Sequence, residues 1–193
     1  MNIKAQVIKE EGGEPRLMSH QLEIPKDHIT TDVLFSALNH RDVWIMKGQY
    51  GNINYPVILG SDGLVEHNGG KYIINPGLSW GDKQAYQGKD FDILGMPSDG
   101  CFAEKVHIPK DYLHAKPEHM TDEEAAALPL AGLTAFRALF SRANVQKGER
   151  VFISGIGGGV ALFAMQFAIA NGCEVYVSSS SEEKINNAVN LGA

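Results

Sequence analysis

Cysteine is scarce in this sequence. Among 193 residues only Cys101 and Cys173 occur, and they lie far apart in the chain. A four-cysteine zinc site is therefore excluded. A disulfide-stabilised secreted domain is not indicated either, so we expect a reducing, cytoplasmic location. We interpret both residues as ordinary buried thiols.

Basic clusters and long apolar runs are also missing. Lysine and arginine total 17 against 23 aspartates and glutamates, for a formal net charge of -6, and no basic block occurs. Nucleic-acid binding thus has little electrostatic support. No apolar run approaches the roughly 18 residues that span a bilayer, and residues 1–15 lack the apolar core of a signal peptide. We expect neither a nucleic-acid nor a membrane partner.

The first part of the chain, to about His114, is interrupted every few residues by Gly, Pro, Asn or Asp. Short β-like runs lie between the interruptions: IKAQVIK, DVLFSAL, KYIINPG and FAEKVHIP. Many short strands separated by turn signals predict a β-rich domain of barrel type. The pattern changes near Pro117, so we place this domain at residues 1–118.

Residues 119–193 are predicted to hold helices followed by alternating strands and helices. Thr121 and Glu124 have capping-box spacing, and Pro129 is poorly tolerated inside a helix, so two helices should meet there. From Arg150 we predict a strand VFISG, a helix over 160–171, a strand CEVYVSS and a helix over 182–191. This βαβα order predicts a parallel sheet covered by helices, and the fold class is α/β with a β-rich part.

A cluster of glycines joins the first of these strands to its helix. Glycines let the backbone approach a diphosphate, and helix N-termini favour negative charge. The dinucleotide fingerprint is imperfect here, because one register lacks its first glycine and the other its last small residue. A glycine turn without a ligand is therefore the alternative. The residues expected to contact the diphosphate are Gly157, Gly158, Gly159 and Val160.

The end of the second parallel strand bears on the choice of cofactor. An acidic residue there binds the ribose hydroxyl of NAD, and it would repel the 2′-phosphate of NADP. Here the strand ends in serines, and Ser178, Ser180 and Lys184 suit a 2′-phosphate. We therefore predict NADPH in preference to NADH, although Lys184 as a solvated surface residue is the alternative.

Four blocks together resemble the medium-chain dehydrogenase/reductase superfamily, and within it the zinc-independent quinone oxidoreductases. They are ALNHRDVWIMKGQYGNINYPVILGSDG, DGCFAEKVHIP, LPLAGLTAFRAL and SGIGGGVALFAMQFA. The resemblance implies a GroES-like catalytic domain over 1–118 and the first βαβα portion of an NAD(P)-binding Rossmann domain within 119–193. A complete Rossmann domain normally has about six strands, so we expect a truncated chain. The resemblance also implies a homodimer in the full-length form.

The resemblance bears on metal as well. Where zinc-dependent members carry a cysteine and a His-Glu pair, this chain has Asn39 and, after Gly60, Ser61 and Asp62. Asparagine and serine are poor zinc ligands. The resemblance therefore implies no metal site.

The expected catalytic residues, again by resemblance, are Asn39 and Tyr50, which the family places at the floor of the cleft. Asn39 would orient the nicotinamide or the substrate, and Tyr50 would donate a hydrogen bond or proton to the developing oxyanion. Asp42 is expected to fix the loop. Thr134 matches a threonine whose hydroxyl approaches the nicotinamide. A packed turn aromatic is the alternative for Tyr50, and a hydroxyl bonded to its own helix is the alternative for Thr134.

The function predicted from these observations is NADPH-dependent hydride transfer, without zinc, to a quinone, enone or other activated carbonyl compound. The chain would be a fragment of such an enzyme, and as an incomplete chain it would lack activity by itself. Two alternatives remain open. One is a non-catalytic truncated chain that serves binding or assembly, and the other is a relative of zinc-type alcohol dehydrogenase.

Overall fold

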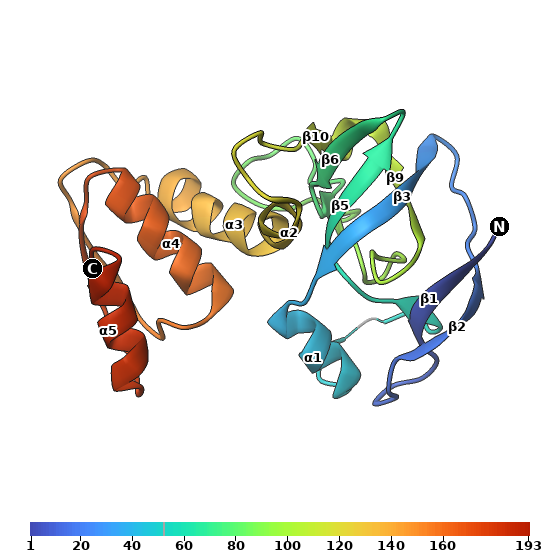
Figure 1. Ribbon diagram of the computed structural model, residues 1–193, viewed down its shortest axis with the longest axis horizontal. Coiled ribbons are helices and arrows are strands. Elements are labelled where there is room, and N and C mark those ends of the chain that lie inside the picture. The colour runs from blue at the N-terminus through green and yellow to red at the C-terminus, as the bar shows by residue number, and fades with distance from the viewer. Residues whose placement is uncertain (52) are drawn as a thin grey trace. The chain divides into compact units, whose positions relative to one another are not determined.

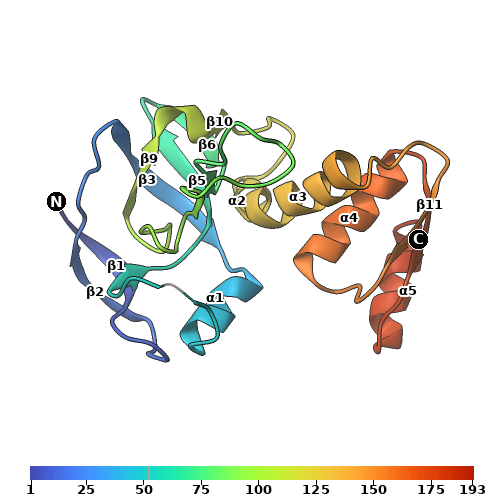
Figure 2. The ribbon, with the colours of Figure 1, turned by 180° about the vertical axis from the view of Figure 1, so that it is seen from behind.

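The structure is a computed structural model that describes residues 1–51 and 53–193. The chain forms two compact units, Met1–Leu130 and Ala131–Ala193 (Figures 1 and 2). The sequence placed the domain boundary earlier, at 118/119. Residues 119–130 group with the first unit because Ala125 and Ala126 pack against Leu64 in one apolar cluster. As a division between domains, 118/119 stays a prediction.

The first unit is rich in antiparallel strands. Its main sheet has the order β10-β6-β5-β3-β9, with bounds Leu113–Ala115, Gly70–Ile74, Asp62–His67, His28–Ala37 and Lys105–Pro109. A second sheet has the order β2-β1-β4, with bounds Arg16–Gln21, Asn2–Ile8 and Val57–Ile58. A short pair joins β7 (Gly77–Leu78) to β8 (Asp92–Ile93). The helical elements are α1 (His40–Met46), η1 (Lys110–Tyr112) and α2 (Asp122–Ala127).

Apolar side chains from these strands form the core of the first unit. One cluster joins Val65, Ile74 and Ile108 of the main sheet to Leu94. Separate clusters centre on Ile58 and Ile45. The four β-like runs of the sequence are confirmed as β1, β3, β6 and β9, and the GroES-like, β-rich character of this part is confirmed with them.

The register of β3 positions the segment that follows it. A bulge between Val33 and Phe35 shifts the pairing, and Ala37 then lies opposite Asp62, the first residue of β5. An extra residue in one strand bends it locally and redirects the side chains beyond it. Asn39, two residues after the end of the strand, is thereby brought to the start of β5.

Helix α2 begins as its sequence predicts. The Thr121 Oγ1 atom accepts the Glu124 N–H at 3.2 Å, and the Glu124 carboxylate accepts the Thr121 N–H at 2.9 Å. Pro129 starts a separate helix, α3 (Pro129–Phe136), which leads into η2 (Arg137–Arg142), a turn of π-helix. The prediction of two helices meeting at Pro129 is confirmed.

Thr121→Ala is expected to lower the free energy of unfolding by about 1 kcal/mol, because the variant loses the cap of α2. Urea denaturation monitored by circular dichroism measures this change. Thr121→Ser keeps the hydroxyl and should recover most of the loss. Equal destabilisation by both variants would show that the cap does not stabilise α2.

The second unit contains the βαβα segment. Strands β11 (Arg150–Ile153) and β12 (Glu174–Val177) pair in parallel, and helices α4 (Gly159–Ala170) and α5 (Glu182–Asn190) follow them. Met165 and Ala168 of α4 are buried in one cluster with Val175 and Ala188. The opposite face of the strand pair is open, since the paired Phe152 and Tyr176 are 67% and 49% exposed. Within the described part of the chain, no helix is both long and apolar enough to cross a bilayer.

Candidate functional site

In the first unit, the N-terminal residues of α1 pair with residues 60–62. Asn39 Nδ2 donates to Asp62 Oδ2 at 2.7 Å, and Arg41 Nη1 donates to the Ser61 hydroxyl. The Asp42 carboxylate accepts a backbone hydrogen bond from Gly60. Asn39, Arg41 and Asp42 therefore each bind one residue of the segment 60–62.

Asn39 has a second set of bonds because it caps α1. Its backbone N–H donates to Asp42 Oδ2 at 2.8 Å, which is half of a capping box. This is the arrangement expected for Asp42, a buried carboxylate that holds the loop backbone. Of the positions that matched the ligands of zinc-dependent relatives, Asn39 and Asp62 are thus joined by a direct hydrogen bond.

Asp62 is the most deeply buried carboxylate of this cluster, at 1% exposed. Its Oδ1 atom accepts the Leu130 N–H at 2.6 Å, so each oxygen has one donor. Burial raises the pKa of Asp62 to about 6, and the donors from Asn39 and Leu130 offset part of that rise. Burial likewise raises the pKa of Asp42, against its bond from the Asn39 backbone and the positive charge of Arg41. With a pKa of about 6, Asp62 is mostly ionised at neutral pH and then acts as an acceptor.

Arg41 links this cluster to Tyr50. Arg41 is 9% exposed, and its Nη1 atom also donates to the Leu94 carbonyl at 3.2 Å. The Arg41 Cζ atom lies 5.5 Å from the centre of the Tyr50 ring, within the range of a cation–π contact. Tyr50 itself is 38% exposed. The predicted catalytic residues Asn39 and Tyr50 thus flank the two ends of α1, and Arg41 contacts the second of them.

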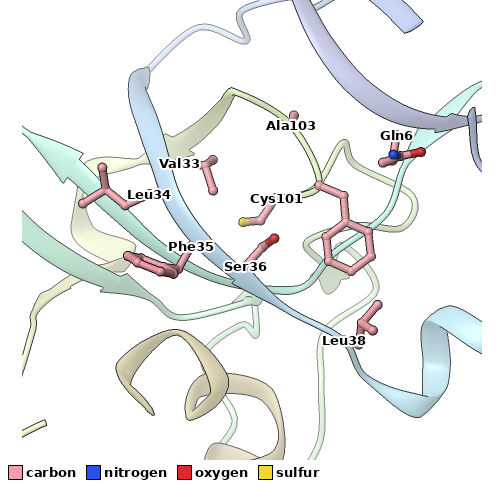
Figure 3. Close-up of a pocket in the computed structure, with 9 residues that line it drawn as sticks. Gln6, Val33, Leu34, Phe35, Ser36, Leu38, Cys101 and Ala103 are labelled. Atoms are coloured by element: carbon pink, nitrogen blue, oxygen red, sulfur yellow. The ribbon is translucent and has the colours of Figure 1, made fainter. Parts of the chain in front are cut away.

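A pocket of about 460 Å³ opens between β3 and the segment 101–103 (Figure 3). Its lining is mostly apolar, with Leu34, Phe35, Leu38 and Phe102 among the contributors. The buried Cys101 thiol also lines it, and burial raises the pKa of that thiol well above its usual value. None of the predicted site residues lines this pocket, although Leu38 directly precedes Asn39.

The predicted interpretation of the thiols holds for Cys101, which is buried, but Cys173 is only partly buried. Cys173 lies after the end of α4, where its Sγ atom donates to the Gln146 carbonyl at 3.4 Å. Among the described residues, no group of three or more His, Cys, Asp and Glu side chains has an arrangement that could hold a metal ion.

In the second unit, the glycine turn leaves its backbone accessible. Gly158 precedes α4 as its N-cap, and the first bond inside the helix is from Leu162 N–H to the Gly158 carbonyl at 3.0 Å. The N–H groups of the first turn thus lack partners within the helix. A Cβ atom built on Gly158 meets nothing within 4 Å, so the space above it is open. This geometry fits a diphosphate.

Lys184 lies across the same turn. Gly157 has a φ of +134°, and a Cβ atom built there would lie 2.7 Å from Lys184 Cδ and 3.1 Å from its Nζ. The buried Ile156 anchors the turn to β12, because its N–H donates to the Ser178 carbonyl at 2.9 Å. The structure thus brings together Gly157, Ser178 and Lys184 at the ends of the two parallel strands.

The remaining predicted cofactor residues lie at the protein surface. Ser180, Gly159 and Val160 are exposed, as is Thr134 on α3. The hydroxyls of the neighbouring serines, Ser179 and Ser181, accept main-chain hydrogen bonds at the start of α5. Ser181 Oγ accepts the Lys184 N–H at 3.4 Å, and Ser179 Oγ accepts the Ser181 N–H at 3.1 Å.

Two residues of the first-unit cluster were missed in the sequence. Asp62 was considered only as part of the pair that stands where zinc-dependent members carry His and Glu, and Arg41 was not considered at all. The sequence signal that could have pointed to these two residues was the presence of charged side chains in the segments NHRD and GSD. Because 23 residues separate Asn39 from Asp62, their contact depends on the register of β3 with β5, which the sequence pattern does not specify.

This chain is similar to known oxidoreductases in sequence. Residues 25–118 match the family model of the alcohol dehydrogenase GroES-like domain. A zinc-type alcohol dehydrogenase-like protein of Schizosaccharomyces pombe is 34% identical over 100% of this chain and 61% of its own length. An acryloyl-coenzyme A reductase of Sulfurisphaera tokodaii is 32% identical over 82% of this chain and 53% of its own length. The chain therefore spans between half and two thirds of these relatives.

Among solved structures, the quinone oxidoreductase of Thermus thermophilus, also determined in complex with NADPH, is 29% identical. Its TM-score is 0.79, and the match covers 98% of this chain and 57% of that one. The similarity includes both the β-rich unit and the βαβα unit.

Proposed function

The chain belongs to the medium-chain dehydrogenase/reductase superfamily, and from that premise we propose that it carries the dinucleotide-binding turn and the catalytic side chains of an NADPH-dependent reductase. The substrate would be a quinone, an enone or another activated carbonyl compound. The observation that carries the proposal is the glycine turn, with open space above Gly158 and Lys184 across Gly157.

The residues of the second unit would hold the cofactor by its phosphates. The free N–H groups at the start of α4 would bind the diphosphate, with Gly157, Gly158, Gly159 and Val160 forming the turn. The Lys184 ammonium would pair with the 2′-phosphate, beside the hydroxyls of Ser178 and Ser180. Thr134 would contact the nicotinamide through its hydroxyl. When bound, the reduced nicotinamide supplies a hydride.

Asn39 and Tyr50 would act on the reacting end. The Asn39 amide would orient the nicotinamide or the substrate, and the Tyr50 hydroxyl would donate a hydrogen bond or proton to the oxygen on which negative charge develops. We propose that this happens without zinc. The support is the donor set, since Asn39 and Ser61 are poor ligands and the Asn39 amide is bound to Asp62 at 2.7 Å.

The location, the partners and the oligomeric state that we propose are those expected from the sequence. We propose a cytoplasmic protein whose partner is the small-molecule substrate, with no nucleic-acid or membrane partner, and a homodimer in the full-length form. The name of the Schizosaccharomyces pombe relative, a zinc-type protein, keeps zinc-dependent alcohol dehydrogenase as the second candidate. Activity that a chelator abolishes and zinc restores would favour that candidate.

Lys184→Ala is expected to raise the Kd for NADPH by about 10-fold to 100-fold, because one charge-assisted hydrogen bond is lost. The Kd for NADH should change less than about two-fold, since NADH has no 2′-phosphate. Fluorescence titration with each cofactor measures both values.

The matched control is Lys147→Ala, because the Lys147 side chain also lies over a glycine of positive φ, Gly172, in the same unit. It should leave both Kd values unchanged. Equal weakening of NADPH and NADH by Lys184→Ala would contradict the assignment of the 2′-phosphate to Lys184.

A further inference from the structure

We propose that Asp62 is a positioning residue that sets the direction of the Asn39 amide. This inference rests on the proposed function in one respect, because it takes Asn39 as a residue of the reacting end. Three observations carry it: the hydrogen bond from the Asn39 amide, the depth at which Asp62 is buried, and its second bond to the main chain.

The hydrogen bond defines which way the amide faces. Asp62 Oδ2 lies 2.7 Å from Asn39 Nδ2, and a carboxylate can only accept. The nitrogen of Asn39, and not its oxygen, must therefore point to Asp62. One of the two Nδ2 hydrogens is used in this bond. Under the proposed function, the other Nδ2 hydrogen would donate toward a ligand.

Burial makes this bond strong and its geometry specific. Asp62 is 1% exposed, so water cannot replace the Asn39 amide as donor. An amide turned the other way would place its oxygen against a buried carboxylate oxygen and leave both without a donor. Leaving buried polar atoms without partners is costly, which disfavours the flipped amide.

Asp62 is itself held in place by the main chain. Its Oδ1 atom accepts the Leu130 N–H at 2.6 Å, in the first turn of α3, and the residue opens β5 opposite Ala37 of β3. The carboxylate is therefore anchored from the strand and from the helix. Because the Asp62 carboxylate is held in this way, it fixes the direction of the Asn39 amide that is bound to it. A positioning residue requires such an anchor.

Amide hydrogen exchange in the wild-type protein tests the bond without any substitution. One Asn39 Nδ2 hydrogen should exchange about ten-fold or more slowly than the side-chain amide of an exposed asparagine such as Asn186. Asn39→Ala identifies the resonance by its disappearance. Exchange of both Asn39 Nδ2 hydrogens at the rate of Asn186 would overturn the proposal.

A double-mutant cycle on kcat, measured in the full-length form, tests the positioning role. Asp62→Asn has the same shape without the charge and should lower kcat roughly ten-fold, whereas in an Asn39→Ala background it should change kcat less than about two-fold. The control is Asp99→Asn, since Asp99 also accepts a backbone N–H, that of Ile58 at 2.9 Å, but contacts neither Asn39 nor Leu130. Asp99→Asn should leave kcat within about two-fold.

The outcomes separate this inference from the proposed function. An equal loss of kcat from Asp62→Asn in both backgrounds would overturn the positioning role, because Asp62 would then act independently of Asn39. An unchanged kcat in Asp62→Asn, with a lowered kcat in Asn39→Ala, would overturn the positioning role and leave the proposed function intact. An unchanged kcat in Asn39→Ala would overturn both the role of Asn39 in the proposed function and its positioning by Asp62.

Discussion

Gly158→Leu is expected to raise the Kd for NADPH by about 1,000-fold, equivalent to about 4 kcal/mol, while the protein stays folded. The reason lies in the open space above the turn. A Cβ atom on Gly158 meets no atom within 4 Å, so the protein leaves room for a side chain to begin at this position. It would instead fill the space that the diphosphate needs when it approaches the backbone. Fluorescence titration with NADPH measures the loss.

Two measurements make this result specific. Gly158 has φ of -90° and ψ of 151°, a conformation open to any residue, so the free energy of unfolding should fall by no more than about 1 kcal/mol. Ala170→Leu adds a bulky side chain at the exposed far end of the same helix and should leave the Kd unchanged. Binding of NADPH by Gly158→Leu with wild-type affinity would mean that no diphosphate contacts this turn.

Tyr50→Phe is expected to lower kcat by about 100-fold, with the KM for the substrate nearly unchanged. The substitution removes only the hydroxyl that would donate to the developing oxyanion. The ring, and with it the contact with the Arg41 guanidinium at 5.5 Å, is retained. Steady-state kinetics of the full-length form, with a quinone and an enone as substrates, separate kcat from KM.

The control is Tyr86→Phe. Tyr86 is also exposed and also has a cation near its ring, with Lys83 Nζ at 5.1 Å, but no role in the reaction is assigned to it. Its loss of a hydroxyl should leave kcat unchanged. If Tyr50→Phe behaved like Tyr86→Phe, Tyr50 would be a packed turn aromatic and the proton donor would have to be sought elsewhere.

The fold was predicted best where its signals are local. The two parallel strands, their helices and the break at Pro129 follow from hydrophobic periodicity and from residues that start or end helices, and each was placed within a few residues of its position in the structure. Strands β2 and β5 were not predicted. Residues 16–21 are mostly polar and mostly exposed, and β5 opens with Asp62 and Gly63, which are typical of turns. Only pairing with distant strands makes these segments extended.

In the candidate site, too, the contacts that have a local sequence signal were predicted and the others were not. The proximity of Gly157 and Lys184 follows from the parallel order of β11 and β12, because the carboxyl ends of parallel strands lie at one edge of a sheet. The bond between Asn39 and Asp62 depends on a bulge in β3 and on the register of β3 with β5, and neither has a local sequence signal. For the same reason the grouping of α2 with the first unit was not predicted, since it depends on packing against Leu64.

The central claim, a zinc-independent reductase that uses NADPH, is tested most directly by following NADPH absorbance with a quinone or an enone as acceptor after exhaustive chelation of metal. The full-length form should oxidise NADPH in proportion to the acceptor consumed, faster than NADH, and at the same rate with and without the chelator. Activity that disappears on chelation and returns with zinc, or oxidation of NADH in preference to NADPH, would contradict it.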